Sequence, residues 1–177
     1  MHSNEKVSEI AKKIKLLIVD VDGVLTDGGI YFDDNGVEQK KFDSQDGLGI
    51  KLLQLSGIEV AVITARSTKS VAHRLKGLGV EHYYHGILDK SIALEKLIKK
   101  LSIDPSESAY VGDDVIDLPV MTRVALPIAV ANAQESVKEH ALMVTEKSGG
   151  NGAVREVCNF LLKSQDKYDA LVKSFLK

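Results

Sequence analysis

The sequence predicts an α/β fold in which helices cover a mostly parallel central sheet. Short apolar and β-branched runs recur along the chain, and amphipathic stretches separate them. Polar residues follow the ends of these runs, where ligand sites of open α/β sheets lie. Because this alternation is typical of a parallel sheet between helices, we expect a Rossmann-like three-layer α/β/α sandwich.

Four apolar runs are the predicted strands. The first, LLIV at residues 16–19, has no polar side chain, which is typical of a strand buried on both faces. It stops at Asp20. The others are IEVAVIT ending at Thr64, SAYVGDD ending near Asp113 and VALPIAV ending near Val130.

The amphipathic stretches between these runs are the predicted helices. They cover residues 46–55, 68–77, 90–100, 118–123, 134–140 and 151–175. The last belongs to a helical tail of about residues 151–177.

Residues 29–43 interrupt the alternation of strand and helix. The extended pieces IYF and VEQKKF flank the turn sequence DDNG, which predicts a β-hairpin. Because it directly follows the first strand, the hairpin is expected to project from the carboxyl edge of the sheet, where it can cover a site.

Length and composition suit one domain over residues 1–177. The 23 Lys and Arg against 25 Asp and Glu give a net charge of −2, so no basic excess favours nucleic-acid binding. A single Cys excludes an internal disulfide or a Cys-rich metal cluster. The chain has no apolar run near the roughly 18 residues of a membrane span, and its start lacks the apolar core of a signal peptide. We therefore expect a cytoplasmic protein that binds neither nucleic acid nor membrane.

Carboxylates gather at the predicted strand ends. Asp20 and Asp22 follow the first strand, and Asp113, Asp114 and Asp117 follow another. Each alone is as readily a helix cap or turn residue. Together they place several negative charges at one edge, and oxygen ligands of this kind favour Mg²⁺.

Thr64 and Lys90 add a hydroxyl and an ammonium to this edge. Thr64 closes a strand and Lys90 opens a helix, positions where a Thr is usually only a cap and a Lys usually solvated. With the carboxylates they form a set suited to phosphoryl transfer: a nucleophile, a metal site and donors for phosphate oxygens.

The order DVDGVLT, Thr64, Lys90 and GDDVID resembles the four motifs of the haloacid dehalogenase superfamily. The resemblance implies that Asp20 attacks phosphorus and that Asp22 is the general acid and base. It also implies Mg²⁺ held by the Asp20 and Asp113 carboxylates and the Asp22 carbonyl. Thr64 and Lys90 would bind phosphoryl oxygens, while Asp114 and Asp117 would orient Lys90 or metal-bound water.

Further stretches, among them GVLTDGGIYFDDNG, FDSQDGLGIKLL and GGNGAVREV, resemble the small 3-deoxy-D-manno-octulosonate 8-phosphate phosphatases, which have no large cap domain. This resemblance implies a phosphorylated sugar acid as substrate, a role in lipopolysaccharide precursor synthesis, and a homotetramer with sites at subunit interfaces. Ala65 replaces a frequent Gly of the family, and Ser44-Gln45 lies in a variable part of its loop. The expected substrate contacts are Asp22, Asp43, Ser44, Gln45, Asp46, Gly47, Lys51, Arg66, Arg74 and Lys90. Arg155, in the tail, is a further candidate.

Three alternatives remain at this point. The enzyme could act on a nine-carbon keto-sugar-acid phosphate or another small sugar phosphate, because one or two contacts change selectivity by only about 1–3 kcal/mol each. A phospho-accepting receiver domain uses similar groups, but its acidic pair comes early in the chain. A non-catalytic oligomerisation module would not need the complete acidic set.

Overall fold

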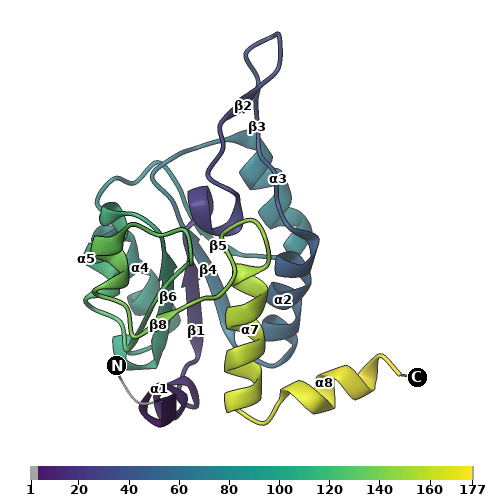
Figure 1. Cartoon of the computed structure of the whole chain (residues 1–177), viewed down its shortest axis with the longest axis vertical. Helices are drawn as coiled ribbons and strands as arrows, with labels where there is room; N and C mark the ends of the chain where they lie inside the picture. The colour runs from purple at the N-terminus through teal and green to yellow at the C-terminus, as the bar shows by residue number, and fades with distance from the viewer. Residues whose placement is uncertain (1–3, 177) are drawn as a thin grey trace.

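Six strands form the central sheet, and the first strand lies in its interior (Figure 1). The computed structural model describes residues 4–176. The strand order in the central sheet is β5-β4-β1-β6-β7-β8, and all neighbouring pairs are parallel. The strands are β1 (Leu16–Val19), β4 (Glu59–Ile63), β5 (His82–Tyr84), β6 (Ser108–Gly112), β7 (Leu126–Ala129) and β8 (Met143–Val144). Val19 of β1 pairs with Val62 of β4 and Val111 of β6, so these strands end at one edge.

Helices cover both faces of this sheet, which confirms the predicted three-layer fold. On one side lie α2 (Ser44–Leu55), α3 (Lys69–Leu78) and α7 (Ala153–Ser164), and on the other α4 (Lys90–Leu101) and α5 (Leu118–Met121) (Figure 1). The remaining helices are α1 (Asn4–Ala11), α6 (Glu135–Lys138) and α8 (Tyr168–Ser174). Among the helices of residues 4–176, none has the length and apolar character needed to cross a membrane.

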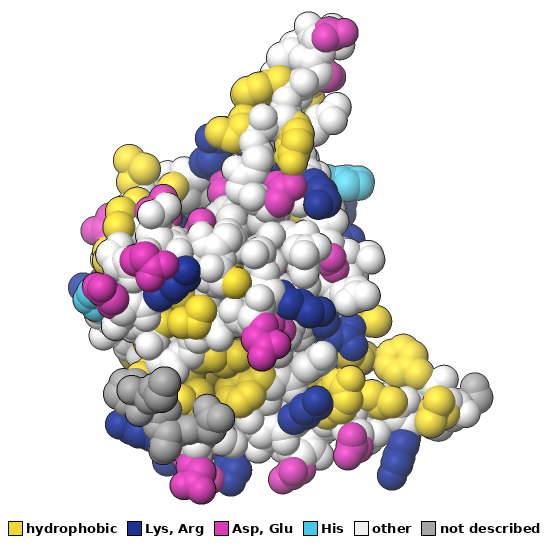
Figure 2. Space-filling model, viewed as in Figure 1, with side chains coloured by type: hydrophobic (Ala, Val, Ile, Leu, Met, Phe, Trp, Pro, Cys, Tyr) yellow, Lys and Arg dark blue, Asp and Glu magenta, His cyan; other side chains and the backbone are white. Residues whose placement is uncertain are grey.

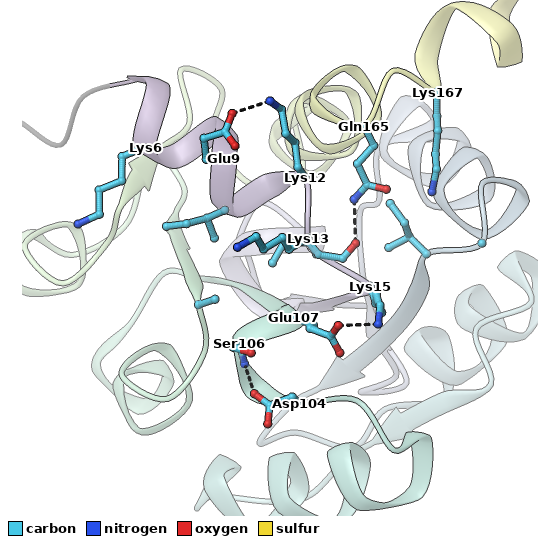
Figure 3. A pocket seen from close by; sticks show the side chains of 15 residues that line it. Lys6, Glu9, Lys12, Lys13, Lys15, Asp104, Ser106, Glu107, Gln165 and Lys167 are labelled. Carbon is cyan, nitrogen blue, oxygen red and sulfur yellow. Dashed lines mark hydrogen bonds and ion pairs between the residues drawn. The ribbon is translucent and has the colours of Figure 1, made fainter.

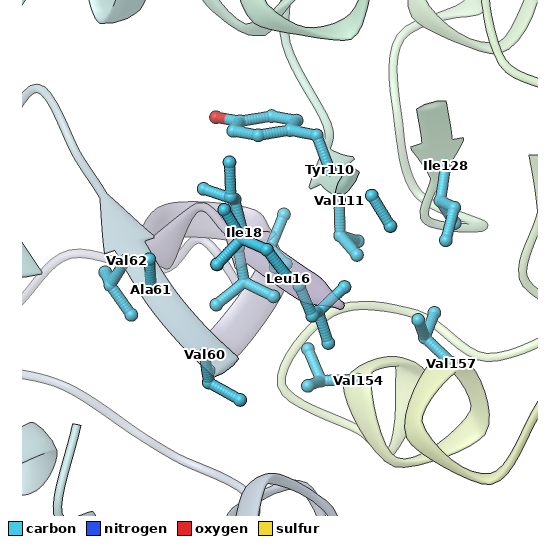
Figure 4. Packing of buried hydrophobic residues seen from close by; sticks show 14 of the residues in the cluster. Leu16, Ile18, Val60, Ala61, Val62, Tyr110, Val111, Ile128, Val154 and Val157 are labelled. Carbon is cyan, nitrogen blue, oxygen red and sulfur yellow. The ribbon is translucent and has the colours of Figure 1, made fainter. Parts of the chain in front are cut away.

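The core forms around β1. All four of its side chains are fully buried, as the unbroken apolar run predicts. Figure 4 shows Leu16 and Ile18 between side chains of β4 and β6, with Val154 of α7 beside them. Each such side chain contributes about 1.5–3 kcal/mol when fully buried. This packing fixes the strand whose end carries Asp20.

Some elements differ from the predictions. The short edge strands β5 and β8 and helix α1 were not predicted, because too few residues carry a periodic pattern. The predicted helix 151–175 is wrong as one element: α7 ends at Ser164 and α8 begins at Tyr168. Between them Asp166 has a φ of 55°, a left-handed conformation that cannot continue a helix.

The predicted hairpin is confirmed and projects from the carboxyl edge of the sheet (Figure 1). Its strands are β2 (Tyr31–Phe32) and β3 (Glu38–Gln39). In the turn, Asp33 Oδ1 accepts the backbone N–H groups of Asn35 and Val37 at 2.9 and 2.8 Å. Gly36 supplies the positive φ of 75° that this turn needs.

Candidate active site

Three neighbouring strands deliver polar side chains to one pocket. Asp20 follows β1, Thr64 follows β4 and Asp113 follows β6. The pocket is lined by Asp20, Asp22, Gly23, Gly28, Thr64, Ala65, Arg66, Asp113, Asp114 and Ile116. The structure thus brings together most of the side chains to which the sequence assigns a role in phosphoryl transfer.

A tight turn over Val21–Leu25 (η1) carries Asp22 away from the sheet. Its Gly23 has a φ of 82°, and a Cβ at this position would collide with the Asp113 carboxylate. The buried Thr26 hydroxyl donates to the Val21 carbonyl at 3.2 Å and accepts the Gly28 N–H at 3.3 Å. The turn, with Asp22 near its start, is therefore held partly by the residues that directly follow it.

Lys90 contacts Asp20 from outside the set of residues that line the pocket, so its predicted contact with a phosphoryl oxygen stays a prediction. Its side chain is fully buried, and its Nζ is 2.8 Å from Asp20 Oδ1 and 2.6 Å from Asp117 Oδ1. It also donates to the Tyr110 hydroxyl at 3.2 Å. A buried ammonium needs such partners, because an unpaired charge in the interior is costly. Lys90 thereby fixes the Asp20 carboxylate.

Asp117 organises the same cluster. Its Oδ1 accepts from Lys90 and from the Tyr110 hydroxyl, at 2.6 Å each. Its Oδ2 accepts the backbone N–H groups of Asp113 and Asp114 at 2.9 and 3.2 Å. Both oxygens are therefore engaged, which favours an orienting role over direct metal ligation. Asp114 accepts the Val115 N–H at 2.7 Å and begins the short helix η3 (Val115–Asp117).

Mg²⁺ fits this donor set. Carboxylate oxygens of Asp20, Asp113 and Asp117 lie within 4.8 Å of one another. Burial, with the neighbouring carboxylates, raises the pKa of Asp113 to about 8. Burial likewise raises the pKa of Asp20 to about 7, although Lys90 opposes the rise. A hard divalent cation would relieve this excess of buried negative charge, and the Asp20 and Asp113 carboxylates with the Asp22 carbonyl would hold it.

We expect Mg²⁺ to raise the melting temperature more at alkaline than at acidic pH. Because the folded-state pKa values of Asp20 and Asp113, about 7 and about 8, exceed the ordinary 3.8, the folded state holds their protons more tightly. The contribution of these two carboxyls to stability without metal is therefore fully present below their ordinary pKa of 3.8 and is lost as pH rises through about 7 and about 8. Thermal unfolding with EDTA or Mg²⁺ at about pH 5.5 and about pH 8.5 measures the effect. An equal gain at both pH values would contradict it.

The hairpin reaches this pocket through charged side chains that the sequence analysis did not single out. Lys40, directly after β3, contacts the Asp22 carboxylate and lies 2.8 Å from Glu38 Oε1. Arg66 also reaches Glu38, with Nη2 2.7 Å from Oε2. The sequence offered one indication of this contact: because side chains alternate along a strand, residues 38 and 40 lie on the same face of the hairpin.

The predicted substrate loop at residues 43–47 is the first turn of α2, which begins at Ser44 and not at residue 46. Asp43 Oδ1 accepts the N–H groups of Gln45 and Asp46, at 2.6 and 3.1 Å, so these donors are already engaged. The side chain of Asp46 is buried and accepts the Arg155 N–H of α7 at 2.7 Å. One Asp46 oxygen is thus engaged by the N-terminal turn of α7, and the contact of Asp46 with substrate stays a prediction.

Several other expected substrate contacts lie outside the residues that line this pocket. Arg74 of α3 donates to the Asp43 carbonyl at 3.3 Å, and Lys51 is exposed on α2. Neither they nor Asp43, Ser44, Gln45 and Gly47 line the pocket of one chain. Their contact with substrate stays a prediction that requires a neighbouring subunit.

The glycine-rich loop SGGNG packs against the turn that carries Asp22. Asn132 donates to the Gly23 carbonyl at 3.1 Å and accepts the Gly149 N–H at 2.6 Å. A Cβ on Gly149 would collide with the Gly23 carbonyl. The loop SGGNG therefore has a packing reason for its glycines, and Asn132 was missed because its partners are distant in sequence.

A wider cavity lies at the opposite, amino edge of the sheet (Figure 3). Lys12, Lys15 and Lys167 line it, but each has an internal partner: Glu9, Glu107 and the Ser56 carbonyl. The cavity lies before the start of β1, β4 and β6, far from the strand ends that carry the carboxylates. It does not contribute to the candidate active site.

Comparisons with known proteins agree with this fold. Residues 84–157 match the haloacid dehalogenase-like hydrolase family. The chain is 52% identical over 159 residues to the 3-deoxy-D-manno-octulosonate 8-phosphate phosphatase of Escherichia coli K12, covering 90% of this chain and 85% of that protein. The Moraxella catarrhalis phosphatase of the same name, solved with a magnesium ion, a phosphate ion and KDO, has a TM-score of 0.95. It is 46% identical, with 98% of this chain and 99% of that chain covered. The cobalt-bound Haemophilus influenzae phosphatase has a TM-score of 0.91 at 38% identity, with 95% and 99% covered.

Fold, acidic pocket and sequence together define a haloacid dehalogenase-like hydrolase without a large cap domain. This class excludes the receiver-domain interpretation. Within it, the chain belongs to the 3-deoxy-D-manno-octulosonate 8-phosphate phosphatase family and is a phosphoric monoester hydrolase.

Proposed function

We propose that this enzyme hydrolyses 3-deoxy-D-manno-octulosonate 8-phosphate to the free sugar acid and phosphate, with Mg²⁺, in lipopolysaccharide precursor synthesis in the cytoplasm. The observation that carries the proposal is the pocket in which Asp20, Asp22, Thr64 and Asp113 meet above Lys90. The 52% identity to the Escherichia coli phosphatase supports the choice of substrate.

In the first step, an Asp20 carboxylate oxygen attacks phosphorus and forms an aspartyl phosphate. The bond between phosphorus and the sugar oxygen breaks, and the Asp22 carboxyl gives its proton to that oxygen. Thr64 lies at the pocket wall, where its hydroxyl can bind a phosphoryl oxygen. Lys90 supplies positive charge from below. Mg²⁺, when bound, neutralises negative charge on the transferring phosphoryl group.

In the second step, Asp22 takes a proton from a water molecule, whose oxygen attacks phosphorus. The bond between phosphorus and the Asp20 oxygen breaks, which releases phosphate and restores the carboxylate. Asp22 is suited to both roles because its side chain is 26% exposed, within reach of water and substrate, whereas Asp20 is nearly buried.

Arg66 is the proposed contact for the sugar-acid carboxylate. It lines the pocket two residues after Thr64, and its planar guanidinium can bind a carboxylate through two parallel hydrogen bonds. In one chain this guanidinium is 43% exposed and already pairs with Glu38, which is itself a carboxylate. This pairing supports the proposal, because the guanidinium at the pocket already binds one carboxylate within the chain.

The substrate assignment is tested by rates of phosphate release from a panel at equal concentration. The panel contains the eight-carbon keto-sugar-acid phosphate, its nine-carbon analogue and common hexose phosphates. We expect the highest kcat/KM for the eight-carbon compound. A higher value for the nine-carbon compound would replace the substrate while leaving the phosphatase chemistry intact, and equal values would remove the assignment.

We propose that four chains assemble and that neighbours complete each site. The hairpin exposes large apolar side chains, with Ile30, Phe32 and Val37 each more than half exposed (Figure 2). Apolar surface of this kind on a projecting element is typical of a contact between subunits. The exposed or half-buried residues Asp43, Ser44, Gln45, Lys51 and Arg74 would then reach a neighbour's pocket. Light scattering is expected to give four times the chain mass, and a monomer would contradict the shared site.

A further inference from the structure

The side chain of Lys40 links the hairpin to Asp22. Lys40 is fully buried in its side chain and contacts both the Asp22 and the Glu38 carboxylates. The contact to Asp22 is a hydrogen bond, whereas Glu38 Oε1, at 2.8 Å, makes an ion pair without hydrogen-bond geometry. A buried ammonium between two carboxylates has few alternative positions, because leaving either partner would leave charge unpaired.

Glu38 is in turn held from its other side. Its Oε2 accepts from Arg66 Nη2 at 2.7 Å, and its side chain is only 15% exposed. The four side chains alternate in charge, from Asp22 through Lys40 and Glu38 to Arg66. They join the turn after β1, the returning strand of the hairpin and the segment after β4. The orientation of Asp22 is therefore tied to two other segments of the chain.

This connection matters because Asp22 can transfer a proton only when its carboxyl is correctly oriented. Nothing else in its side-chain environment fixes it: within residues 4–176, Lys40 is the one side chain that makes a hydrogen bond or ion pair with its carboxylate. A general acid must lie within hydrogen-bond reach of the atom it protonates, and a misplacement of about 1 Å can cost about 100-fold in rate.

We propose that Lys40 is a positioning residue that holds the Asp22 carboxyl in place for proton transfer, with Glu38 and Arg66 as its anchor. The inference rests on the proposed function, in which Asp22 protonates the sugar oxygen. The hairpin then does more than cover the pocket, because it supplies the group that orients the acid.

The test compares two leaving groups in Lys40→Met. The alkoxide of a sugar phosphate needs a proton to leave, whereas p-nitrophenolate does not. Formation of the aspartyl phosphate determines kcat/KM in both cases. We expect kcat/KM for the sugar phosphate to fall by about 10- to 100-fold, and for p-nitrophenyl phosphate by less than about threefold.

Lys41→Met is the matched control. Lys41 is adjacent in sequence but 63% exposed, and its Nζ is 3.8 Å from Asp27. The Lys41→Met substitution should leave kcat/KM unchanged for both the sugar phosphate and p-nitrophenyl phosphate. A double-mutant cycle adds a second measurement: with Asp22→Asn already present, Lys40→Met should cause no further loss, because it acts through Asp22.

Equal losses on both substrates, or full additivity with Asp22→Asn, would overturn the positioning role and leave Lys40 a structural residue. Circular dichroism of each variant identifies a loss that comes from unfolding, and such a loss would lower both substrate rates together. Wild-type protein that releases phosphate from neither substrate would instead overturn the proposed function, and this inference with it.

Discussion

Asp20→Asn is expected to lower phosphate release by about 10³-fold or more while the protein stays folded. The amide has the shape of the carboxyl but is a far weaker nucleophile, so the aspartyl phosphate cannot form. The fold should persist because Lys90 keeps its contacts to Asp117 and Tyr110. Burial already raises the pKa of Asp20 to about 7, so a neutral side chain there removes an unfavourable buried charge.

The measurement pairs initial rates with thermal unfolding in EDTA. Asp104→Asn is the control, since Asp104 caps a short helix at the far edge of the sheet and Asn preserves that cap. A melting temperature equal to or above the wild type, with activity lost, is the expected result. Activity near the wild type in Asp20→Asn would remove Asp20 as the nucleophile.

Lys90→Met is expected to cause the largest loss of stability, about 3–5 kcal/mol in the free energy of unfolding without Mg²⁺. The substitution leaves the carboxylates of Asp20 and Asp117 buried without their shared cation. Activity should fall with it, because in the proposed mechanism the same ammonium supplies positive charge to the phosphoryl site.

The loss should be greater at about pH 8 than at about pH 6. Burial raises the pKa of Asp20, and Lys90 opposes this rise, so removing Lys90 raises it further. A carboxyl with a raised folded-state pKa stabilises the fold while protonated and loses that contribution as pH rises. Denaturant unfolding at both pH values, with Lys99→Met on the exposed face of α4 as control, measures the difference. If Lys90→Met lost no more stability than Lys99→Met, the stabilising role of Lys90 in the buried cluster would be contradicted.

The sequence predicts those parts of the site that local chemistry determines. An unbroken apolar strand followed by Asp20 requires a carboxylate at the sheet edge, and the parallel register brings Thr64 and Asp113 beside it. The hairpin was predicted from DDNG, because the turn residues and the flanking extended pieces specify it locally.

The parts that the sequence did not predict depend on tertiary contacts. Lys40 and Lys41 are indistinguishable as adjacent lysines, and only the strand's orientation buries one and exposes the other. The contact between Asp46 and the N-terminal turn of α7 was not predicted either, because it joins residues that are 109 positions apart in the sequence. Asn132 is more than 100 residues from the Gly23 carbonyl that it binds, so no local pattern marks it.

The most direct test of the proposed activity is the time course of phosphate release from 3-deoxy-D-manno-octulosonate 8-phosphate by the wild-type protein, with Mg²⁺ or with EDTA. We expect steady release of many phosphates per chain with Mg²⁺ and almost none with EDTA. Release that stops at one phosphate per chain, or that is the same in EDTA, would contradict a Mg²⁺-dependent phosphatase built on Asp20.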